Sequence, residues 1–413
     1  MQLLIKNIGC LAGIIEDDSR RLCGKAMAHV NTLTNAWLIA DEGIINDFGI
    51  GEEPMPKDEC RVIDACGAMV MPCFADPHTH IVYAHDRGME FRDKICGLSY
   101  EQIAQRGGGI LNSVDALHDM TEDELFETSL QRVNEAIATG TGCMEIKSGY
   151  GLSTEDELKM LRVIRRIRQT SDIEIRSTFL GAHAVARRFG NNREAYVDYL
   201  ITEMLPAVGE AGLADFIDVF CDRGFFTADD TARILEAGAR WGMRPKIHAD
   251  ELAAIGGVKV GADHNALSID HLENMPDDEM LLLHDTPVMP TVLPGTSFFL
   301  NMPYAPARRL IDSGLPVAIA SDMNPGSTPS SDMRFCMSLA CIKMRMLPEE
   351  AFNAATINAA YAMGVSHSHG SITRGKAANL IITKPHTPDI TTLTYRYTRP
   401  AIERIILKGE DIA

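Results

Sequence analysis

The sequence predicts an α/β fold, a (β/α)8 barrel of the TIM type with a small β-domain built from both chain ends. Between residues 69 and 365, eight apolar runs of strand length alternate with amphipathic helices, which is typical of parallel α/β folds. Residues 1–68 and 366–413 hold short strand-like segments instead. We therefore expect residues 69–365 to form the barrel, and residues 1–68 and 366–413 to share the second domain.

The strands of the terminal domain are expected where apolar or alternating segments are bounded by turn residues. These segments are residues 3–5, 36–39 and 43–48 in the first part of the chain, and 378–383 and 402–408 in the last part. Asp41, Glu42 and Gly43 supply a turn between the second and third segments. No long helical period occurs in residues 1–68, so a strand-rich domain is the prediction.

The middle of the chain supplies the barrel elements in order. The expected strands are residues 69–74, 141–147, 174–180, 216–220, 244–248, 266–270, 286–293 and 317–320. The clearest helices are residues 122–138, 154–171, 193–205, 228–241 and 349–363. In the second of these helices Met160, Val163 and Ile167 fall on one face, which indicates packing against the sheet.

The composition excludes some functions. The chain has 413 residues, 46% of them hydrophobic, and 39 Lys and Arg against 57 Asp and Glu give a net charge of −18. This balance argues against binding nucleic acid or an anionic membrane through a general basic surface. No apolar stretch approaches the ~20 residues of a membrane span, and no secretory signal is evident. We expect a cytoplasmic protein that acts on a small molecule, and apolar residues on the barrel helices would allow a homodimer.

Polar, mostly titratable residues follow six of the apolar runs, where a barrel places its catalytic residues. They are His78 and His80; Lys147 to Tyr150; His183; His248, Asp250 and Glu251; Asp270 and His271; and Asp322 to Pro325. Structural ion pairs would have no reason to favour histidine so often. This pattern predicts an active site at the carboxyl ends of the strands.

We interpret His78, His80, His248 and Asp322 as metal ligands. If the chain stays extended after residue 74, His78 and His80 project to the same side. Three imidazoles and one carboxylate suit one zinc or iron ion and leave a site for water, whose pKa the metal would lower toward ~7. The alternatives are two surface histidines in a turn, a core histidine at position 248, and a turn or helix cap at position 322.

Further residues are candidates for proton transfer and substrate binding. His271 could polarise a carbonyl, and Glu251 could move a proton or be a first-turn helix acid. Arg87 has the planar fork that grips a carboxylate, and the alternative is an ion pair with Asp86 or Glu90. Tyr150 could contact the substrate or be a half-buried loop aromatic. The triplet Gly107–Gly109 lacks the Lys-Ser/Thr of a phosphate-binding loop.

Seven motifs span most of the chain. They are Asp76-Pro-His-Thr-His80 with Asp86-Arg87, Gly107-Gly-Gly-Ile110, Glu145-Ile-Lys-Ser-Gly-Tyr-Gly151, Thr178-Phe-Leu-Gly-Ala-His183, His248-Ala-Asp-Glu251, Asp270-His-Leu-Glu273 and Ser321-Asp-Met-Asn-Pro-Gly326. The sequence resembles the amidohydrolase superfamily and, within it, the imidazolonepropionases. Ser327 stands where many members carry Thr, which keeps the hydroxyl.

The resemblance implies a barrel with a small β-sandwich and one zinc or iron ion per chain. It implies hydrolysis of the ring amide of 4-imidazolone-5-propanoate to N-formimidoyl-L-glutamate, a step of histidine degradation. The metal ligands fall on the set given above, and the substrate contacts on Arg87, Tyr150, His183, Glu251, Asn324, Gly326 and Ser327. The catalytic roles fall to Glu251, His271 and Asp322, and the choice of the general base stays open.

Three alternatives remain beside this interpretation. Another amidohydrolase acting on a carboxylate-bearing cyclic amide, or a related deaminase, would use the same ligands. Lys147 could carry a carboxylate bridge between two metals, as in two-metal amidohydrolases. We prefer one metal, since the family that the sequence resembles is mononuclear. A barrel that binds metal or ligand without catalysis is the remaining, non-enzymatic interpretation.

Overall fold

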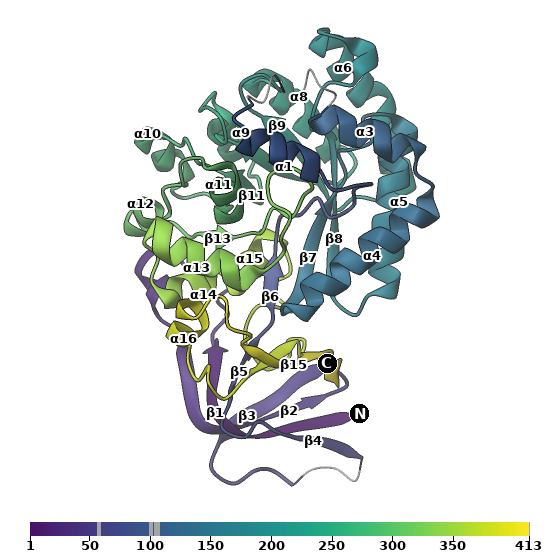
Figure 1. The fold of residues 1–413 in the computed structure, drawn as a ribbon. Helices are drawn as coiled ribbons and strands as arrows, with labels where there is room; N and C mark the ends of the chain where they lie inside the picture. Colours follow the sequence, from purple (N-terminus) through teal and green to yellow (C-terminus); the bar gives the residue numbers. More distant parts are fainter. Residues whose placement is uncertain (56–58, 99–101, 103–107, 413) are drawn as a thin grey trace.

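The computed structural model describes residues 1–55, 59–98, 102 and 108–412, so Gly107 of the glycine triplet lies outside the described residues. Its main body is a parallel barrel surrounded by helices (Figure 1). The barrel strands are β6 (Phe74–Asp76), β7 (Thr141–Lys147), β8 (Glu174–Ala182), β9 (Phe216–Cys221), β10 (Arg244–Ala249), β11 (Ser268–His271), β12 (Met289–Val292) and β13 (Ala318–Ile319). The predicted barrel is thereby confirmed, with each strand paired to the next in chain order.

The barrel closes between its first and last strands. Thr79, just after β6, forms a parallel bridge with Met323, just after β13. The His80 amide donates to the Met323 carbonyl at 2.8 Å, and the Asp322 amide donates to the His78 carbonyl at 3.0 Å. Closure therefore takes place through the residues that the sequence marks as metal ligands.

A second sheet is built from both chain ends, as predicted, and lies beneath the barrel in Figure 1. Its strands are β1 (Gln2–Ile14), β2 (Asn31–Asp41), β3 (Ile44–Ile50), β4 (Cys60–Asp64), β5 (Met69–Pro72), β14 (Leu380–Thr383), β15 (Ile402–Leu407) and β16 (Glu410–Asp411). It has a hydrophobic core of its own, which includes Leu3, Leu38 and Ile406. The domain ranges 1–68 with 366–413 and 69–365 stay a prediction.

The expectation of one barrel strand over residues 69–74 is wrong. β5 pairs with β1 and β14 in the terminal sheet, whereas β6 pairs with β7 in the barrel. Between them the Cys73 amide donates to the Asn379 carbonyl at 2.9 Å, and the Phe74 amide donates to the Gly140 carbonyl at 2.9 Å. The chain thus changes sheets within one apolar run.

Helices follow the strands around the barrel (Figure 1). They are α1 (Gly88–Ile95), α3 (Ile110–Asp119), α4 (Glu122–Ala138), α5 (Thr154–Thr170), α6 (Arg193–Tyr199), α7 (Leu205–Ala211), α8 (Ala228–Ala239), α9 (Gly257–Asp263), α10 (Asp277–Met280), α11 (Pro294–Leu300), α12 (Ala307–Asp312), α13 (Met333–Met344), α14 (Pro348–Ala355) and α15 (Ile357–Ala362). A further helix, α16 (Ile390–Tyr395), follows β14 of the second sheet. The helix expected over 349–363 is two helices, because Thr356 leaves the helical region at φ −122° and ψ −95°. The helix expected over 193–205 continues through a π-helical turn into α7.

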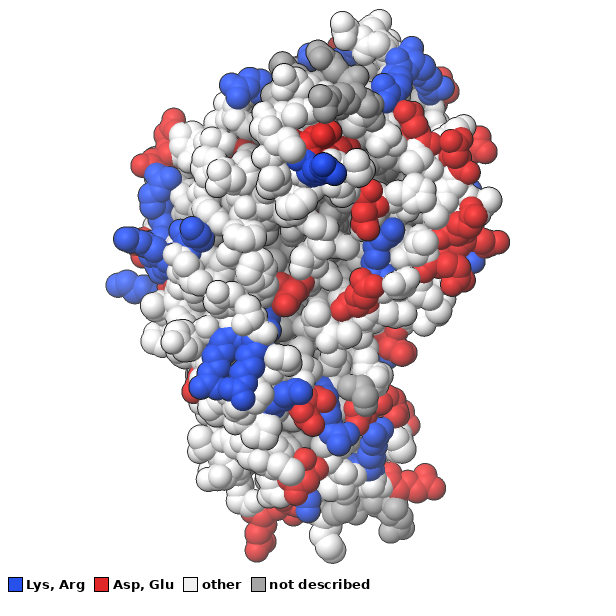
Figure 2. All heavy atoms as spheres, in the orientation of Figure 1, with Lys and Arg blue, Asp and Glu red and all other residues white. Residues whose placement is uncertain are grey.

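Local sequence fixes several helix starts. Thr121 and Glu124 form a capping box at α4, and the Ser153 side chain caps α5. α4 and α5 are also joined by ion pairs from Arg162 to Glu122 at 2.8 Å and from Arg166 to Asp123 at 2.7 Å. Figure 2 shows acidic and basic side chains side by side in this region. Among the described residues, no helix is long and apolar enough to cross a membrane.

Candidate metal centre and active site

The carboxyl ends of β6, β10, β11 and β13 converge at the mouth of the barrel. His78 and His80 follow β6, His248 lies at the end of β10, and Asp322 follows β13. The four side chains are at most 3% exposed. The structure therefore brings together the whole set predicted to bind metal, and the surface-histidine alternative for positions 78 and 80 is wrong.

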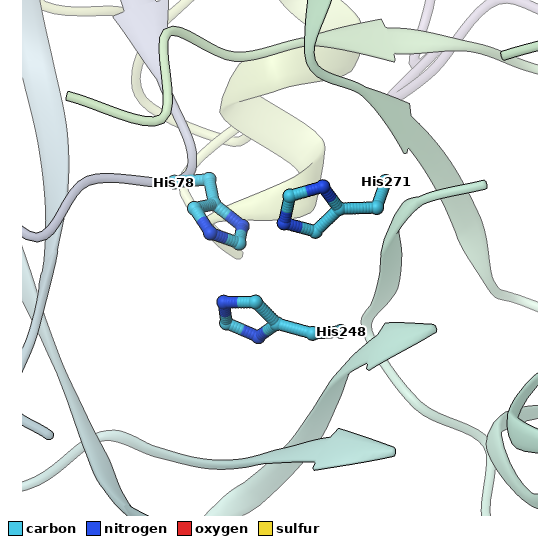
Figure 3. Close-up of side chains that lie close together, drawn as sticks. All are labelled: His78, His248 and His271. Carbon is cyan, nitrogen blue, oxygen red and sulfur yellow. The ribbon is translucent and has the colours of Figure 1, made fainter. Parts of the chain in front are cut away.

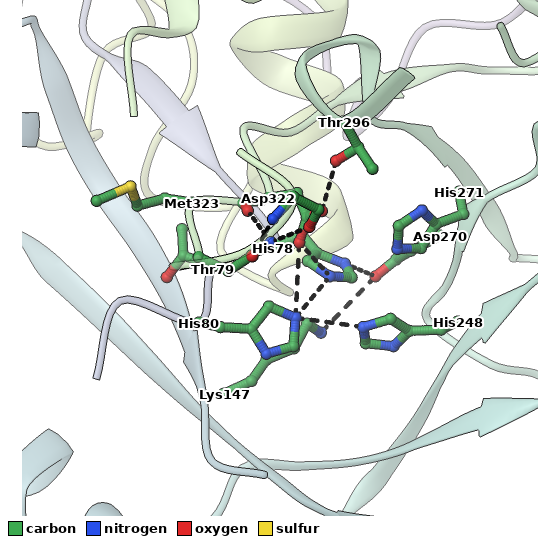
Figure 4. A network of polar contacts seen from close by, with 12 residues as sticks. His78, Thr79, His80, Lys147, His248, Asp270, His271, Thr296, Asp322 and Met323 are labelled. Atoms are coloured by element: carbon green, nitrogen blue, oxygen red, sulfur yellow. Dashed lines mark hydrogen bonds and ion pairs between the residues drawn. The ribbon is translucent and has the colours of Figure 1, made fainter. Parts of the chain in front are cut away.

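The donor atoms of this set lie close together. Nε2 of His80 is 3.3 Å from Nε2 of His78 and 3.3 Å from Nε2 of His248. Oδ1 of Asp322 lies 3.5 Å from Nε2 of His78 and 3.6 Å from Nε2 of His80. Figure 4 shows these atoms facing one another, with Thr296 donating to Oδ2 of Asp322 at 2.5 Å.

The protonation states of the histidines suit the binding of a metal ion. Nδ1 of His78 donates to Asp270 at 2.7 Å, and Nδ1 of His248 lies 3.0 Å from Asp218. Carboxylates on the distal nitrogens leave the Nε2 atoms unprotonated and turned toward His80. Burial, reinforced by neighbouring positive charge and imidazoles, holds the pKa values of His78 and His80 well below their usual range. Neutral imidazoles whose lone pairs converge in a dry site suit a metal cation.

His271 joins the cluster from the end of β11. Figure 3 shows its ring beside those of His78 and His248, with ring centroids 5.5 Å and 5.3 Å away. His78, His248 and His271 form a second group with donor atoms close enough for one ion. His271 differs from the other two because carboxylates flank it: Glu251 lies 3.7 Å from Nε2, and Glu273 lies 3.5 Å from Nδ1.

Electrostatics separate His271 from the predicted ligands. Burial alone would lower its pKa, but Glu251 and Glu273 outweigh burial and raise it well above the usual range. Burial also raises the pKa of Glu251 to about 7, against the opposing effect of His271. The pair thus forms a proton-donating and proton-accepting site beside the predicted metal ligands.

A buried charge network underlies the centre. The Lys147 ammonium donates to Glu145 at 2.6 Å and to Asp218 at 2.8 Å, and lies 3.7 Å from Asp270. Burial opposes its charge, but these carboxylates outweigh burial and raise the pKa of Lys147. Lys246 contacts Glu145 and donates to the Pro77 carbonyl at 2.7 Å. An ammonium held in this way does not offer the neutral amine that a carboxylated bridging lysine requires.

Sequence reasoning missed Glu145, Asp218 and Lys246 as site residues. Each is a charged residue within strand β7, β9 or β10, and each is at most 1% exposed. Such residues face the barrel interior at every second position of a strand. The sequence signal that could have identified these residues is a charged side chain within a buried strand.

The expected substrate residues divide into two groups around the mouth. In the first group, Arg87 donates to Glu90 at 2.7 Å, with both side chains largely buried. A Cβ atom at Gly326 would lie 2.4 Å from Nη1 of Arg87, so the arginine packs directly against the backbone after β13. The ion pair between Arg87 and Glu90, which was the alternative to carboxylate binding by Arg87, is thus present. It lies at the site and not on the surface.

The loop after β13 is fixed by one asparagine. Oδ1 of Asn324 accepts from the amides of Gly326 and Ser327, both at 2.8 Å, and its Nδ2 donates to the Asp322 carbonyl at 2.7 Å. The Ser327 hydroxyl lies 3.3 Å from Oδ2 of Asp322. Asn324, Gly326 and Ser327 therefore hold the loop that carries Asp322, whatever else they contact.

The second group contains Tyr150 and His183. The His183 ring stacks on His80 with centroids 5.1 Å apart, and the Tyr150 ring lies 5.3 Å from His183. Nδ1 of His183 donates to the Gly149 carbonyl at 3.0 Å. Tyr150 is 2% exposed, so it is fully buried and not half-buried, and its contact with substrate stays a prediction. All predicted site residues lie at, or in the segments that follow, the carboxyl ends of the barrel strands.

A closed parallel barrel with histidines and an aspartate at its carboxyl end is the arrangement of a metal-assisted hydrolase. The model of the amidohydrolase family matches residues 69–410. Among solved structures, the chain is similar to a triazine hydrolase variant (TM-score 0.76, 15% identity, 99% of this chain and 94% of that one). It is also similar to E. coli guanine deaminase (TM-score 0.75, 13% identity, 100% and 99%).

The curated relatives are much closer in sequence. Imidazolonepropionase of Christiangramia forsetii is 50% identical over 99% of this chain and all of the relative. Imidazolonepropionase of Geobacillus kaustophilus is 40% identical over 99% of this chain and 97% of the relative. The chain therefore belongs to the amidohydrolase family and, within it, to the imidazolonepropionases, and it is a hydrolase.

Proposed function

We propose that this enzyme hydrolyses the ring amide of 4-imidazolone-5-propanoate to N-formimidoyl-L-glutamate, a step of histidine degradation. The observation that carries the proposal is the convergence of His78, His80, His248 and Asp322 at the barrel mouth, with Arg87 packed against the adjoining loop. The names of the full-length relatives support the same reaction. The cytoplasmic location expected from the sequence belongs to this proposal.

The proposed cofactor is one zinc or iron ion held by those four side chains. When bound, the ion supplies a water of lowered pKa and polarises the substrate carbonyl. Asp270 and Asp218 orient the distal nitrogens of His78 and His248. Lys147 neutralises these carboxylates and Glu145 from below, so the mononuclear prediction is retained.

The remaining roles follow from position. His271, between two carboxylates, donates a hydrogen bond to the ring carbonyl oxygen and stabilises the negative charge that develops there. Asp322 or Glu251 takes the proton of the attacking water and passes it to the leaving ring nitrogen. Arg87 and Tyr150 bind the propionate tail, and His183, Asn324, Gly326 and Ser327 complete the substrate contacts.

The two carboxylates are distinguished by separate Glu251→Gln and Asp322→Asn variants. Turnover lost with metal content retained marks the general base. Because Oδ1 of Asp322 faces His78 and His80, Asp322→Asn is also expected to bind less metal, and its turnover is therefore compared per bound metal ion. Full rates in both variants would contradict this scheme.

The proposed function is tested by following ultraviolet loss of freshly generated imidazolonepropionate, with metal content assayed on the same sample. Because the substrate decays on its own, a blank without enzyme is the control. Ring loss far above the blank and abolished by a chelator is the expected result. No acceleration with one metal bound would contradict the proposed substrate and favour another carboxylate-bearing cyclic amide, or a deamination reaction.

A further inference from the structure

The loop between β7 and α5 is fastened to a buried carboxylate that the scheme above does not use. Glu157, in the first turn of α5, accepts hydrogen bonds from three backbone amides of the loop. The donors are Gly149 at 3.1 Å, Gly151 at 2.8 Å and Leu152 at 2.9 Å. Glu157 is 0% exposed, and hydrogen bonds from several amides to one buried carboxylate are among the strong ones.

This loop carries two of the expected substrate contacts. Tyr150 lies between two of the three donor residues, so its backbone is fixed on both sides. The Gly149 carbonyl accepts from Nδ1 of His183 at 3.0 Å. A carbonyl oxygen only accepts, so this bond places the proton of neutral His183 on Nδ1 and leaves Nε2 as an acceptor.

The local backbone preferences of the loop residues do not by themselves explain the loop conformation. Gly149 has φ 112° and Leu152 has φ 50°, and a positive φ is unfavourable for leucine. A Cβ atom at Gly151 would lie 2.4 Å from the Glu157 amide nitrogen, so loop and helix are in direct contact. The loop conformation therefore depends on α5, and the carboxylate of Glu157 joins the two through three hydrogen bonds.

We propose that Glu157 is a positioning residue for substrate binding, which fixes Tyr150 through the amides of Gly149 and Gly151, and His183 through the Gly149 carbonyl. The inference rests on the proposed function, because the contacts it orders are those of the imidazolone substrate. Glu157 touches neither the predicted metal ligands nor the substrate. Its removal should therefore weaken substrate binding and leave the metal in place.

The test compares Glu157→Gln with the unchanged enzyme in imidazolonepropionate hydrolysis, metal content and thermal unfolding. The amide keeps the size of the side chain, but its NH2 group cannot accept from a loop amide. We expect KM to rise by about tenfold or more with kcat within about threefold, as when binding common to ground and transition states is lost. Glu155→Gln, on the exposed side of the same turn, is the matched control and should change neither constant.

The outcomes separate the inference from the proposed function. Unchanged KM in Glu157→Gln, or an equal loss of activity and metal, would overturn the positioning role while the unchanged enzyme stays active. An inactive unchanged enzyme with metal bound would overturn the proposed function and this inference with it. If Glu157→Gln does not fold, Glu157→Asp is used instead, because it keeps the negative charge but shortens the side chain by one methylene group. A raised KM with normal metal content then supports the positioning role, and a normal KM contradicts it.

Discussion

Asp270 illustrates how single side chains prepare the metal ligands. Its Oδ2 accepts from Nδ1 of His78 at 2.7 Å and lies 3.7 Å from the Lys147 ammonium. Asp270→Asn keeps the shape and removes the charge that favours the Nε2 lone pair. We expect the affinity for zinc to fall by about 10–100-fold, as for other residues that orient metal-binding histidines. Competition with a chromogenic chelator measures this change.

Asp263→Asn is the control for Asp270→Asn, because Asp263 pairs with Lys259 on the exposed face of α9. Its zinc affinity should equal that of the unchanged enzyme. Equal affinities for the Asp270 and Asp263 variants would show that His78 does not need its carboxylate partner.

A substitution at Gly326 tests whether Arg87 binds the substrate carboxylate from its observed position. The site gives Arg87 room only because residue 326 lacks a side chain: an added Cβ would come within 2.4 Å of the guanidinium. The end of a long side chain moves away at little cost, so Gly326→Ala should fold normally. We expect KM to rise by about tenfold or more with a smaller change in kcat, since carboxylate binding is lost. Steady-state kinetics with an unchanged KM would contradict the assignment of Arg87.

At the scale of elements, close packing of helix on strand holds the barrel. Gly238 lies on the buried face of α8, and a Cβ there would lie 2.5 Å from Cδ1 of Ile217 on β9. Gly238→Ala is a favourable change for an isolated helix but overpacks this contact. We expect a net loss of about 1–3 kcal/mol in the free energy of unfolding, measured by denaturant titration. An increase in stability would show that α8 can move away from β9 freely.

Most barrel elements could be predicted because their apolar periodicity is local. β7, for example, has the bounds of the predicted strand 141–147. The run 69–74 could not be resolved into β5 and β6, because both strands are apolar and only their partners differ. The break at Thr356 was likewise invisible, since alanine-rich helix sequence continues on both sides.

The difference between local sequence patterns and long-range contacts also decides which features of the site could be predicted. The convergence of His78, His80, His248 and Asp322 was predictable because each lies at the end of an apolar run, and strand ends of a parallel barrel meet. The support from Glu145, Asp218 and Lys246 was missed because it depends on which strands are neighbours and which side chains point inward. Glu157 was missed for a related reason: its place in a helical first turn looks like an ordinary helix-dipole contact.

At the scale of the whole molecule, both chain ends are joined through Lys376. Its carbonyl accepts from the Ile45 amide at 2.8 Å, and its Nζ donates to the Ser371 hydroxyl at 2.7 Å. The side chain is 3% exposed. Burial, with a smaller effect of Arg20, lowers the pKa of Lys376 to about 8.

This shift predicts how stability depends on pH. Between about pH 8 and the unfolded value near 10.4, the unfolded chain holds a proton that the folded chain has released, so stability rises with pH. The free energy of unfolding of the unchanged enzyme, relative to Lys376→Met, should therefore grow by about 1–3 kcal/mol across this window. Denaturant titrations at pH 7.5 and 10 measure the difference. A difference that does not vary with pH would contradict a folded-state pKa near 8.

We propose that one metal ion, held by His78, His80, His248 and Asp322, makes this barrel a hydrolase of imidazolonepropionate. The most direct measurement strips the enzyme of metal and follows turnover as zinc or iron(II) is returned in known amounts. We predict negligible turnover without metal and a linear rise that ends at one equivalent per chain. Full turnover without metal, or a rise that continues to two equivalents, would contradict the account.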